Sequence, residues 1–263
     1  MSTIGFIGTG SMGSALARAA AKSGVWDEVL LANRGRAKAE SLASEIGGTV
    51  TDNQTAAERA DYLMLGVEPA QIPGVIALIR PALDAREKKA VVVSMAAGVE
   101  LPALRAYLGE DAPAVRIMPN IPAAVGAGVI LWCAAGTVTD EQKSEFLRGM
   151  AEAGTFVEME EGLMKAATGV TGCGPAFAAM FAEALADGAV ACGVPREEAK
   201  KLAALTMLGS AKMLLDAPAD PAALKDLVCS PGGSTIRGVR ALEQGGMRAA
   251  VIDAVITTFE KKW

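Results

Sequence analysis

A glycine-rich segment near the start of the chain restricts the possible fold more than any other feature. It directly follows a short apolar, β-rich run at residues 4–8 and opens a helical pattern at residues 12–23. In that context a GxGxxG spacing is typical of a dinucleotide-binding turn, because its glycines permit a tight turn, close approach of the backbone to the diphosphate, and packing of the helix on the strand. A glycine-rich turn without a ligand is the alternative. The candidate cofactor-binding residues in this turn are Gly8, Thr9, Gly10, Ser11, Met12 and Gly13.

Short β-rich runs alternate with helical stretches over the first part of the chain. Such alternation predicts a parallel sheet with crossover helices. The expected strands are residues 4–8, 28–32, 61–67, 90–94, 115–118, 129–133 and 156–158. We therefore predict an α/β Rossmann-type N-terminal domain over residues 1–160.

The rest of the chain, residues 161–263, contains almost no β-rich run. Its apolar residues recur at helical spacing, as Phe177, Met180 and Leu185 do. Alanine-rich faces in this part allow helices to approach closely, as in a bundle or a dimer interface. We predict an all-α C-terminal domain that completes its core against a second copy of the chain, which makes the protein a homodimer.

The composition narrows the range of functions. Apolar residues make up 51% of the chain and charged residues 21%, so the protein must bury a core. The net charge of −5 gives no indication of a nucleic-acid partner, whose phosphates would favour a basic face, and we expect none. The four cysteines are widely spaced and include no CxxC pair, which indicates reduced thiols and no metal site.

The chain contains no histidine. That absence excludes HExxH zinc chemistry, Ser-His-Asp and Cys-His nucleophile pairs, and any dehydrogenase whose proton donor is imidazole. Neither Tyr62 nor Tyr107 has a lysine four residues later, so the tyrosine–lysine pair of many carbonyl reductases is missing too. The chemistry of this protein therefore works without the usual acids and bases.

The longest uncharged run, residues 117–139, is long enough to span a bilayer. Prolines and glycines interrupt it repeatedly, so a strand, a turn and a second strand are the better interpretation. No basic stretch precedes an apolar run at the N-terminus, and we expect a cytoplasmic protein without a membrane partner.

The end of the second expected strand bears on cofactor choice. An NAD enzyme places an acid there against the ribose, whereas this chain continues Asn33-Arg34-Gly35-Arg36. A guanidinium group can bind a 2′-phosphate through two parallel hydrogen bonds. Arg34 therefore favours NADPH, with NADH as the alternative cofactor. Asn33 is its neutral hydrogen-bonding neighbour, and Arg36 fits a solvated helix start equally well.

Further candidates follow the other strands, because ligands of such sheets bind outside the carboxyl ends of the strands. Each of them also fits an ordinary turn. These additional cofactor candidates are Asn53, Gly66, Val67, Pro69, Ala96, Ala97, Gly98 and Asn120.

A run of small residues precedes a helical stretch late in the chain and is the candidate substrate site. Consecutive backbone N–H groups there, with hydroxyls beside them, suit a carboxylate, although a simple Ser/Thr helix cap is an alternative of equal weight. A second small-residue elbow includes Thr171 and Cys173 and fits either a flat substrate or close helix packing. The substrate candidates are Cys173, Val228, Ser230, Gly232, Gly233, Ser234 and Thr235.

Nearly end to end, the chain resembles pyrroline-5-carboxylate reductases. The segment 224–235, which contains Ser-Pro-Gly-Gly, is specific to that family, whereas the GxGxxG turn is shared widely. The other matching segments are residues 4–13, 94–98, 118–122, 168–176, 183–188 and 242–246. The resemblance implies reduction of the cyclic imine 1-pyrroline-5-carboxylate to L-proline, the last step of proline biosynthesis. It also implies a Rossmann domain followed by a helical substrate-binding and dimerisation domain, with dimers commonly assembled into decamers.

The resemblance assigns roles to individual residues. It implies that the substrate carboxylate and ring are held by Ser230, Gly233, Ser234 and Thr235. It implies contacts to NADPH from Asn53 and from the loops at Val67 and Ala97. Two departures stand out: Cys173 and Phe177 replace the family's usual serine and tyrosine, and Glu68 replaces its usual lysine.

The missing histidine agrees with imine reduction. A protonated imine becomes a neutral amine on hydride addition, so positioning is the main requirement. Thr235 or Thr171 is our candidate catalytic group, hydrogen-bonded to the ring nitrogen. The rivals are a β-hydroxyacid dehydrogenase that uses Lys165 as its acid and a non-catalytic NADPH sensor.

Overall fold

Eight strands form one sheet in the computed structural model, which describes residues 2–216 and 220–260. Their order across the sheet is β3-β2-β1-β4-β5-β6-β7-β8. Strands β1 to β6 run parallel, β7 runs antiparallel to β6, and β8 runs parallel to β7. The strand order reverses between β1 and β4, as it does in Rossmann folds, which confirms the predicted fold class. The bounds are β1 (Thr3–Ile7), β2 (Glu28–Ala32), β3 (Thr49–Thr51), β4 (Tyr62–Leu65), β5 (Val91–Ser94), β6 (Ala114–Met118), β7 (Gly128–Ala134) and β8 (Gly154–Glu158).

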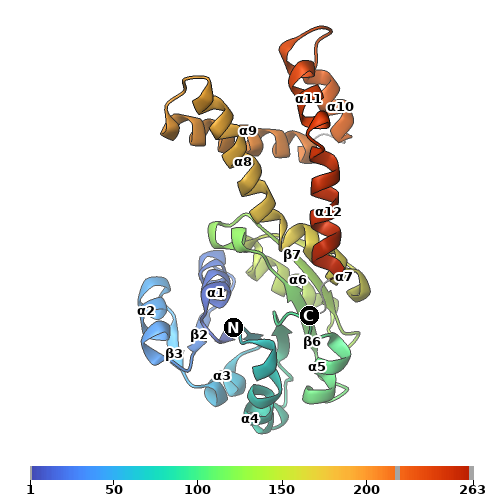
Figure 1. The fold of residues 1–263 in the computed structure, drawn as a ribbon. Helices are drawn as coiled ribbons and strands as arrows, with labels where there is room; N and C mark the ends of the chain where they lie inside the picture. The colour runs from blue at the N-terminus through green and yellow to red at the C-terminus, as the bar shows by residue number, and fades with distance from the viewer. Residues whose placement is uncertain (1, 217–219, 261–263) are drawn as a thin grey trace. The chain divides into compact units, whose positions relative to one another are not determined.

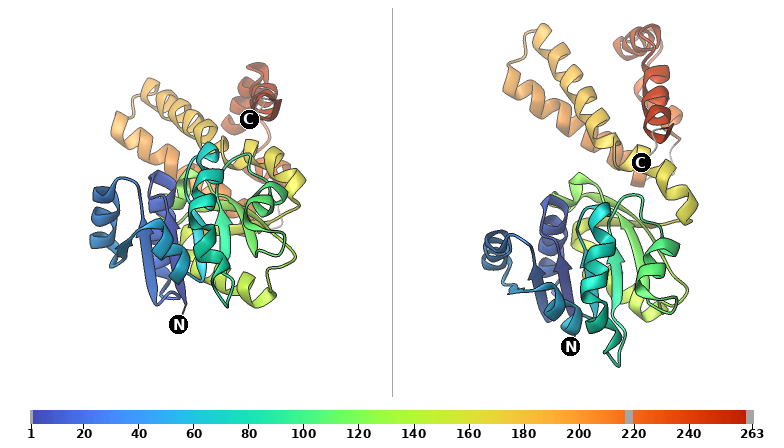
Figure 2. Two further views of the ribbon diagram at one scale, coloured as in Figure 1. Left: turned by 90° about the horizontal axis from the view of Figure 1, so that it is seen from below. Right: turned by 60° about the horizontal axis from the view of Figure 1, so that its bottom comes forward.

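Helices cover both faces of this sheet (Figures 1 and 2). One face packs against α1, α2 and α6, and the other against α3, α4, α5 and α7. Because central strands are buried on both faces, their sequences are continuous apolar runs, which is why the expected strands were readable. These helices are α1 (Ser11–Ser23), α2 (Arg36–Ile46), α3 (Asn53–Arg59), α4 (Ile72–Asp84), α5 (Leu101–Leu108), α6 (Asp140–Gly149) and α7 (Glu161–Thr171).

The connection from β6 to β7 contains the short 3-10 helix η2 (Ile121–Val125). The long uncharged run therefore forms a strand, a turn and a strand, as the sequence predicts. Two further 3-10 turns are η1 (Pro69–Gln71) and η3 (Ala151–Ala153).

The chain divides into two compact units between Gly172 and Cys173. The boundary expected from composition lies earlier, between residues 160 and 161. Helix α7 accounts for the difference, because its Met164 is buried in the apolar core on one face of the sheet. The end of the expected second domain, at residue 263, lies outside the described residues.

The second unit is entirely helical in its described part. Helices α8 and α9 lie side by side and bury a small core of alanines: Ala186, Ala199 and Ala203. Large apolar side chains on other faces remain exposed, among them Leu208 at 66% and Leu227 at 76%. The bounds are α8 (Gly174–Ala191), α9 (Arg196–Asp216), α10 (Pro221–Val228), α11 (Ser234–Gln244) and α12 (Met247–Glu260).

Among the described residues, one helical stretch, Glu161–Ala191, is long and apolar enough to cross a membrane by length and composition alone. The structure interrupts it after Thr171, where α7 ends, and α8 begins at Gly174. Since α7 packs on the sheet through Met164, this stretch is weak evidence for a membrane span.

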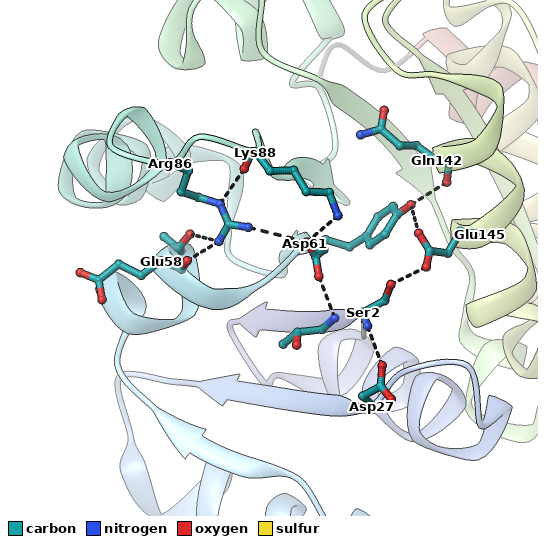
Figure 3. A network of polar contacts seen from close by, with 11 residues as sticks. Ser2, Asp27, Glu58, Asp61, Arg86, Lys88, Gln142 and Glu145 are labelled. Carbon is teal, nitrogen blue, oxygen red and sulfur yellow. Dashed lines mark hydrogen bonds and ion pairs between the residues drawn. The ribbon is translucent and has the colours of Figure 1, made fainter.

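A network of polar contacts closes the amino-terminal edge of the sheet (Figure 3). Tyr62 of β4 is buried, and its hydroxyl donates to Glu145 Oε2 at 2.8 Å. The same carboxylate accepts from the hydroxyl of Ser2 at 2.5 Å. Burial and the Glu145 carboxylate raise the pKa of Tyr62 well above its usual value, so the phenol stays protonated and donates.

Replacing Tyr62 by phenylalanine is expected to lower the free energy of unfolding by about 2 kcal/mol, because Glu145 loses a donor in a partly buried site. Tyr107→Phe is the matched control, since Tyr107 is 40% exposed. Thermal melts of both variants at one protein concentration measure the difference. Equal melting temperatures for the two variants would contradict the expectation.

Candidate active site

The glycine turn after β1 adopts a conformation that side chains would prevent. Gly8 has φ +98°, and a Cβ built on it would lie 2.4 Å from the carbonyl oxygen of Gly66. A Cβ on Gly13 would lie 2.1 Å from the carbonyl oxygen of Gly8. The first and third glycines therefore allow β1, α1 and the loop after β4 to meet closely, as the fingerprint requires.

The second glycine of the turn faces open space instead. A Cβ on Gly10 would have no neighbour within 4 Å among the described residues. Gly10 is also the N-cap of α1 and provides no side-chain cap, so the first N–H groups of the helix are available to a ligand. In addition, the hydroxyl of Thr9 is buried without a hydrogen-bond partner in the described structure. The open space beside Gly10, the uncapped amides of α1 and the unpartnered hydroxyl of Thr9 together fit a dinucleotide diphosphate.

Main-chain bonds bring the ends of the central strands together around this turn. Gly8 N donates to Ala32 O at 2.8 Å, and Gly66 N donates to Ile7 O at 2.8 Å. Because neighbouring parallel strands end at the same edge, the candidates beyond β4 and β5 lie at this edge too. These candidates are Gly66, Val67, Pro69, Ala96, Ala97 and Gly98.

Asn33 and Arg34 leave β2 directly beside the glycine turn. Asn33 Oδ1 accepts from Thr9 N at 3.1 Å, and its Nδ2 donates to Gly35 O at 3.0 Å. Asn33 therefore holds the turn in place. Arg34 is exposed and makes no hydrogen bond or ion pair within residues 2–216 and 220–260, whereas Arg36 pairs with Glu40 at 2.8 Å. Of the two arginines, Arg34 is the one with a free guanidinium group.

Two asparagines among the cofactor candidates have different surroundings. Asn53 is the first residue of α3, and the N-cap of that helix is Asp52, which accepts from Thr55 N at 2.8 Å. This bond lowers the pKa of Asp52. Asn120 is buried, and both polar atoms of its side chain have partners: its Oδ1 accepts from Val129 N at 2.9 Å and its Nδ2 donates to Thr171 O at 2.8 Å. The side chain of Asn120 thus fastens protein segments to one another.

The substrate candidates in the second unit form a tight turn before α11. Gly233 N donates to Ser230 O at 3.0 Å, and Gly232 has φ +70°. Gly233 is the N-cap of α11 and offers no side-chain cap, so the amides of the first helical turn, which begins with Ser234 and Thr235, are free to bind an anion. No Ser or Thr side chain caps this helix in the described structure, so the alternative of a simple Ser/Thr cap does not hold, and the carboxylate site stays a prediction.

The remaining substrate candidates lie at helix ends. Thr171 is the last residue of α7, and its hydroxyl donates to Ala167 O at 3.3 Å. Cys173 is the N-cap of α8, and Val228 is the last residue of α10. Thr171 belongs to the first compact unit, whereas Cys173, Val228 and Thr235 belong to the second.

The sequence interpretation missed an ion pair close to the carboxyl edge of the sheet, where the cofactor candidates lie. Arg116 of β6 is buried and donates to Glu161 Oε1 of α7 at 2.8 Å. A single arginine inside an apolar strand was the available signal, since buried charges are rarely unpaired. Burial raises the pKa of the neighbouring Cys133 thiol to about 11, and Glu161 adds to the rise, so this cysteine stays protonated at neutral pH.

Known proteins match this chain over nearly its whole length. Pyrroline-5-carboxylate reductase of Escherichia coli K12 is 40% identical over 261 residues, which cover 98% of this chain and 96% of that protein. The chain belongs to the pyrroline-5-carboxylate reductase family. The family model for pyrroline-5-carboxylate reductase dimerisation matches residues 161–262, and the model described as NADP oxidoreductase, coenzyme F420-dependent, matches residues 3–98.

Two solved pyrroline-5-carboxylate reductases share the fold. The enzyme from Coxiella burnetii is 31% identical and superposes with a TM-score of 0.89, with coverage of 98% of this chain and 96% of that one. The Plasmodium falciparum enzyme, solved with NADP bound, is 29% identical with a TM-score of 0.85 and covers 98% and 95% of the two chains. As a pyrroline-5-carboxylate reductase with the dimerisation domain of the family, this protein is a homo-oligomeric, NAD(P)H-dependent oxidoreductase.

Proposed function

We propose that this protein reduces 1-pyrroline-5-carboxylate to L-proline with NADPH. The observation that carries the proposal is the full-length match to the reductase family, at 40% identity to the E. coli protein. Two features of the chain agree with it: the open glycine turn at the end of β1 and the uncapped N-terminus of α11.

Different residues would bind the cofactor and the substrate. The turn at Gly8–Gly13 would hold the diphosphate, and Arg34 would bind a 2′-phosphate. The turn at Ser230–Thr235 would hold the substrate carboxylate through helix amides and hydroxyls. Bound nicotinamide supplies the hydride for the imine carbon. This chain needs no histidine for that step, because a protonated imine accepts hydride and becomes a neutral amine.

Thr235 is the better candidate for a hydrogen bond to the ring nitrogen. Its side chain is exposed at the start of α11, where the hydroxyl can accept from the N–H of a protonated imine, whereas Thr171 is only partly exposed. Thr235 also stands beside the amides proposed for the carboxylate, so one turn would orient both ends of the substrate.

Replacing Thr235 by alanine is expected to lower kcat/KM for the imine about tenfold, the effect of one lost hydrogen bond. Steady-state kinetics at saturating NADPH measure it. Thr235→Ser is the matched control, which keeps the hydroxyl and should restore most of the activity. Unchanged kinetics in the alanine variant would remove Thr235 from the site.

The first experiment for the function is NADPH oxidation by the purified protein with 1-pyrroline-5-carboxylate, run beside NADH and beside a 3-keto acid. We expect fast turnover of the imine, with NADPH preferred to NADH, and no turnover of the 3-keto acid. Lys165→Met should retain full activity, because Lys165 is the acid only in the β-hydroxyacid dehydrogenase alternative. Nucleotide binding without turnover of the imine would favour the NADPH sensor instead.

Several finer assignments belong to the same proposal. We expect dimers formed through the helical unit and decamers assembled from them. The exposed apolar faces of α9 and α10 support the dimer, since monomeric proteins rarely expose so many large apolar side chains together. The cytoplasmic location stays a prediction from the sequence. So does the boundary near residue 160 between a cofactor-binding part and a substrate-binding part.

A further inference from the structure

Helix α5 follows the loop that carries three of the cofactor candidates, and its first turn is capped from a distant helix. The N-cap residue of α5, Glu100, makes no side-chain cap bond. Instead, Glu161 Oε1 of α7 accepts from Leu101 N at 2.7 Å. A carboxylate from a different helix thus satisfies the N–H of the first helical residue, one of the four N–H groups at a helix start that have no partner within the helix.

The same oxygen also holds the buried arginine of β6. Arg116 Nη1 donates to Glu161 Oε1 at 2.8 Å, and the side chain of Arg116 is only 5% exposed. Arg116 stands between Ser94 of β5 and Cys133 of β7 in the sheet register. Because an unpaired charge in such a place is costly, Arg116 draws Glu161 against the end of the sheet.

The other end of α7 is fastened independently. Asn120, which follows β6, donates to Thr171 O at 2.8 Å, and Thr171 is the last residue of α7. Both ends of the helix are therefore tied to one strand and its exit loop. Met164 in the middle is buried in the core on that face of the sheet. Helix α7 is thus held against the sheet at both ends and in the middle, which makes it a support from which Glu161 can hold α5.

We propose that Glu161 is a positioning residue for the cofactor: by capping α5 from α7, it fixes the loop of residues 96–100 at the carboxyl edge of the sheet. The inference rests on the proposed NADPH site, because Ala96, Ala97 and Gly98 of this loop are its candidate contacts. Arg116 acts one step further away, since it orients the carboxylate. Neither residue touches the reacting atoms.

Two double variants isolate the cap from the ion pair. Arg116→Met/Glu161→Gln removes both charges and keeps a carbonyl oxygen that can accept from Leu101 N. Arg116→Met/Glu161→Ala removes both charges and the acceptor. Both proteins lack the buried arginine, so neither carries an unpaired charge at this place, and they differ only in the side chain of residue 161.

The alanine double variant is expected to bind NADP⁺ about tenfold more weakly than the glutamine double variant, as measured by calorimetry on the purified full-length proteins. Its KM for NADPH should rise in parallel while kcat stays within about twofold. Hydrogen–deuterium exchange at Leu101 in the cofactor-free protein should be about tenfold faster. Tyr62→Phe, at the opposite edge of the sheet, is the control for general destabilisation and should leave NADP⁺ binding unchanged.

Equal NADP⁺ binding and equal exchange in the two double variants would overturn the inference. So would a similar loss of NADP⁺ binding in Tyr62→Phe, because the effect would then follow stability and not the cap. A parent protein that bound no NADP⁺ would contradict the proposed function. The exchange measurement needs no cofactor, so it decides separately whether Glu161 caps α5.

Discussion

Replacing Gly10 by alanine is expected to weaken NADPH binding about 30-fold, equivalent to about 2 kcal/mol, while the melting temperature of the protein stays the same. Gly10 has φ −69°, which alanine adopts freely, and a Cβ there meets no atom within 4 Å among the described residues. In the proposed cofactor site, the methyl group would occupy space that a diphosphate needs. Calorimetry and a thermal melt of the same preparation measure the two quantities.

Two other glycines serve as controls for this prediction. Gly13→Ala should lower both NADPH binding and stability, because its Cβ would lie 2.1 Å from the carbonyl oxygen of Gly8. Gly74→Ala should change neither binding nor activity, because Gly74 is exposed in α4 and a Cβ there also meets nothing within 4 Å in the described chain. NADPH binding by Gly10→Ala equal to that of the parent would place the diphosphate elsewhere.

Replacing Arg34 by serine is expected to lower kcat/KM with NADPH about 30-fold and to leave kcat/KM with NADH within about twofold. A charge-assisted, bidentate contact to a phosphate is worth about 2 kcal/mol, and only NADPH carries the 2′-phosphate. Arg34 has no competing partner in the described part of the chain, so its guanidinium group is available. Parallel initial-rate measurements with the two cofactors give the ratio.

Arg36→Ser is the matched control for cofactor preference. Arg36 stands two residues later and is engaged with Glu40 of the same helix, an exposed pair that contributes little to stability. Its loss should change the ratio of NADPH to NADH efficiency by less than about twofold. An equal fall in that ratio for both variants would assign the preference to the general positive potential of the loop instead of to Arg34.

The sheet could be predicted from the sequence because its central strands are apolar on both sides and the glycine turn marks the first crossover. The antiparallel direction of β7 could not, since a short apolar run has the same appearance in either direction. The boundary between the two compact units at Gly172 could not be predicted either. Whether a helix packs on the preceding sheet depends on contacts such as that of Met164, not on composition.

Some residues of the candidate site could be predicted from the sequence and others could not. Residues whose role depends on backbone conformation, such as Gly8 and Gly13, were recognisable because only glycine fits there. Residues whose role depends on distant partners were not. The bond from Arg116 joins it to Glu161, 45 residues later, and nothing in the spacing of the two indicates that they meet. The bond between Asn33 and Thr9 is a further example of a contact that only the fold creates.

The sparse core of the helical unit has a practical consequence for assays. The buried apolar residues in its described part are three alanines, and α10, α11 and α12 bury no residue within their described lengths. Mass action then links the stability of this unit to the amount of protein present, because subunits that separate lose the apolar surface they share. Specific activity should fall when the enzyme is diluted and recover when it is concentrated again. Rates for variants are therefore comparable only at one fixed protein concentration.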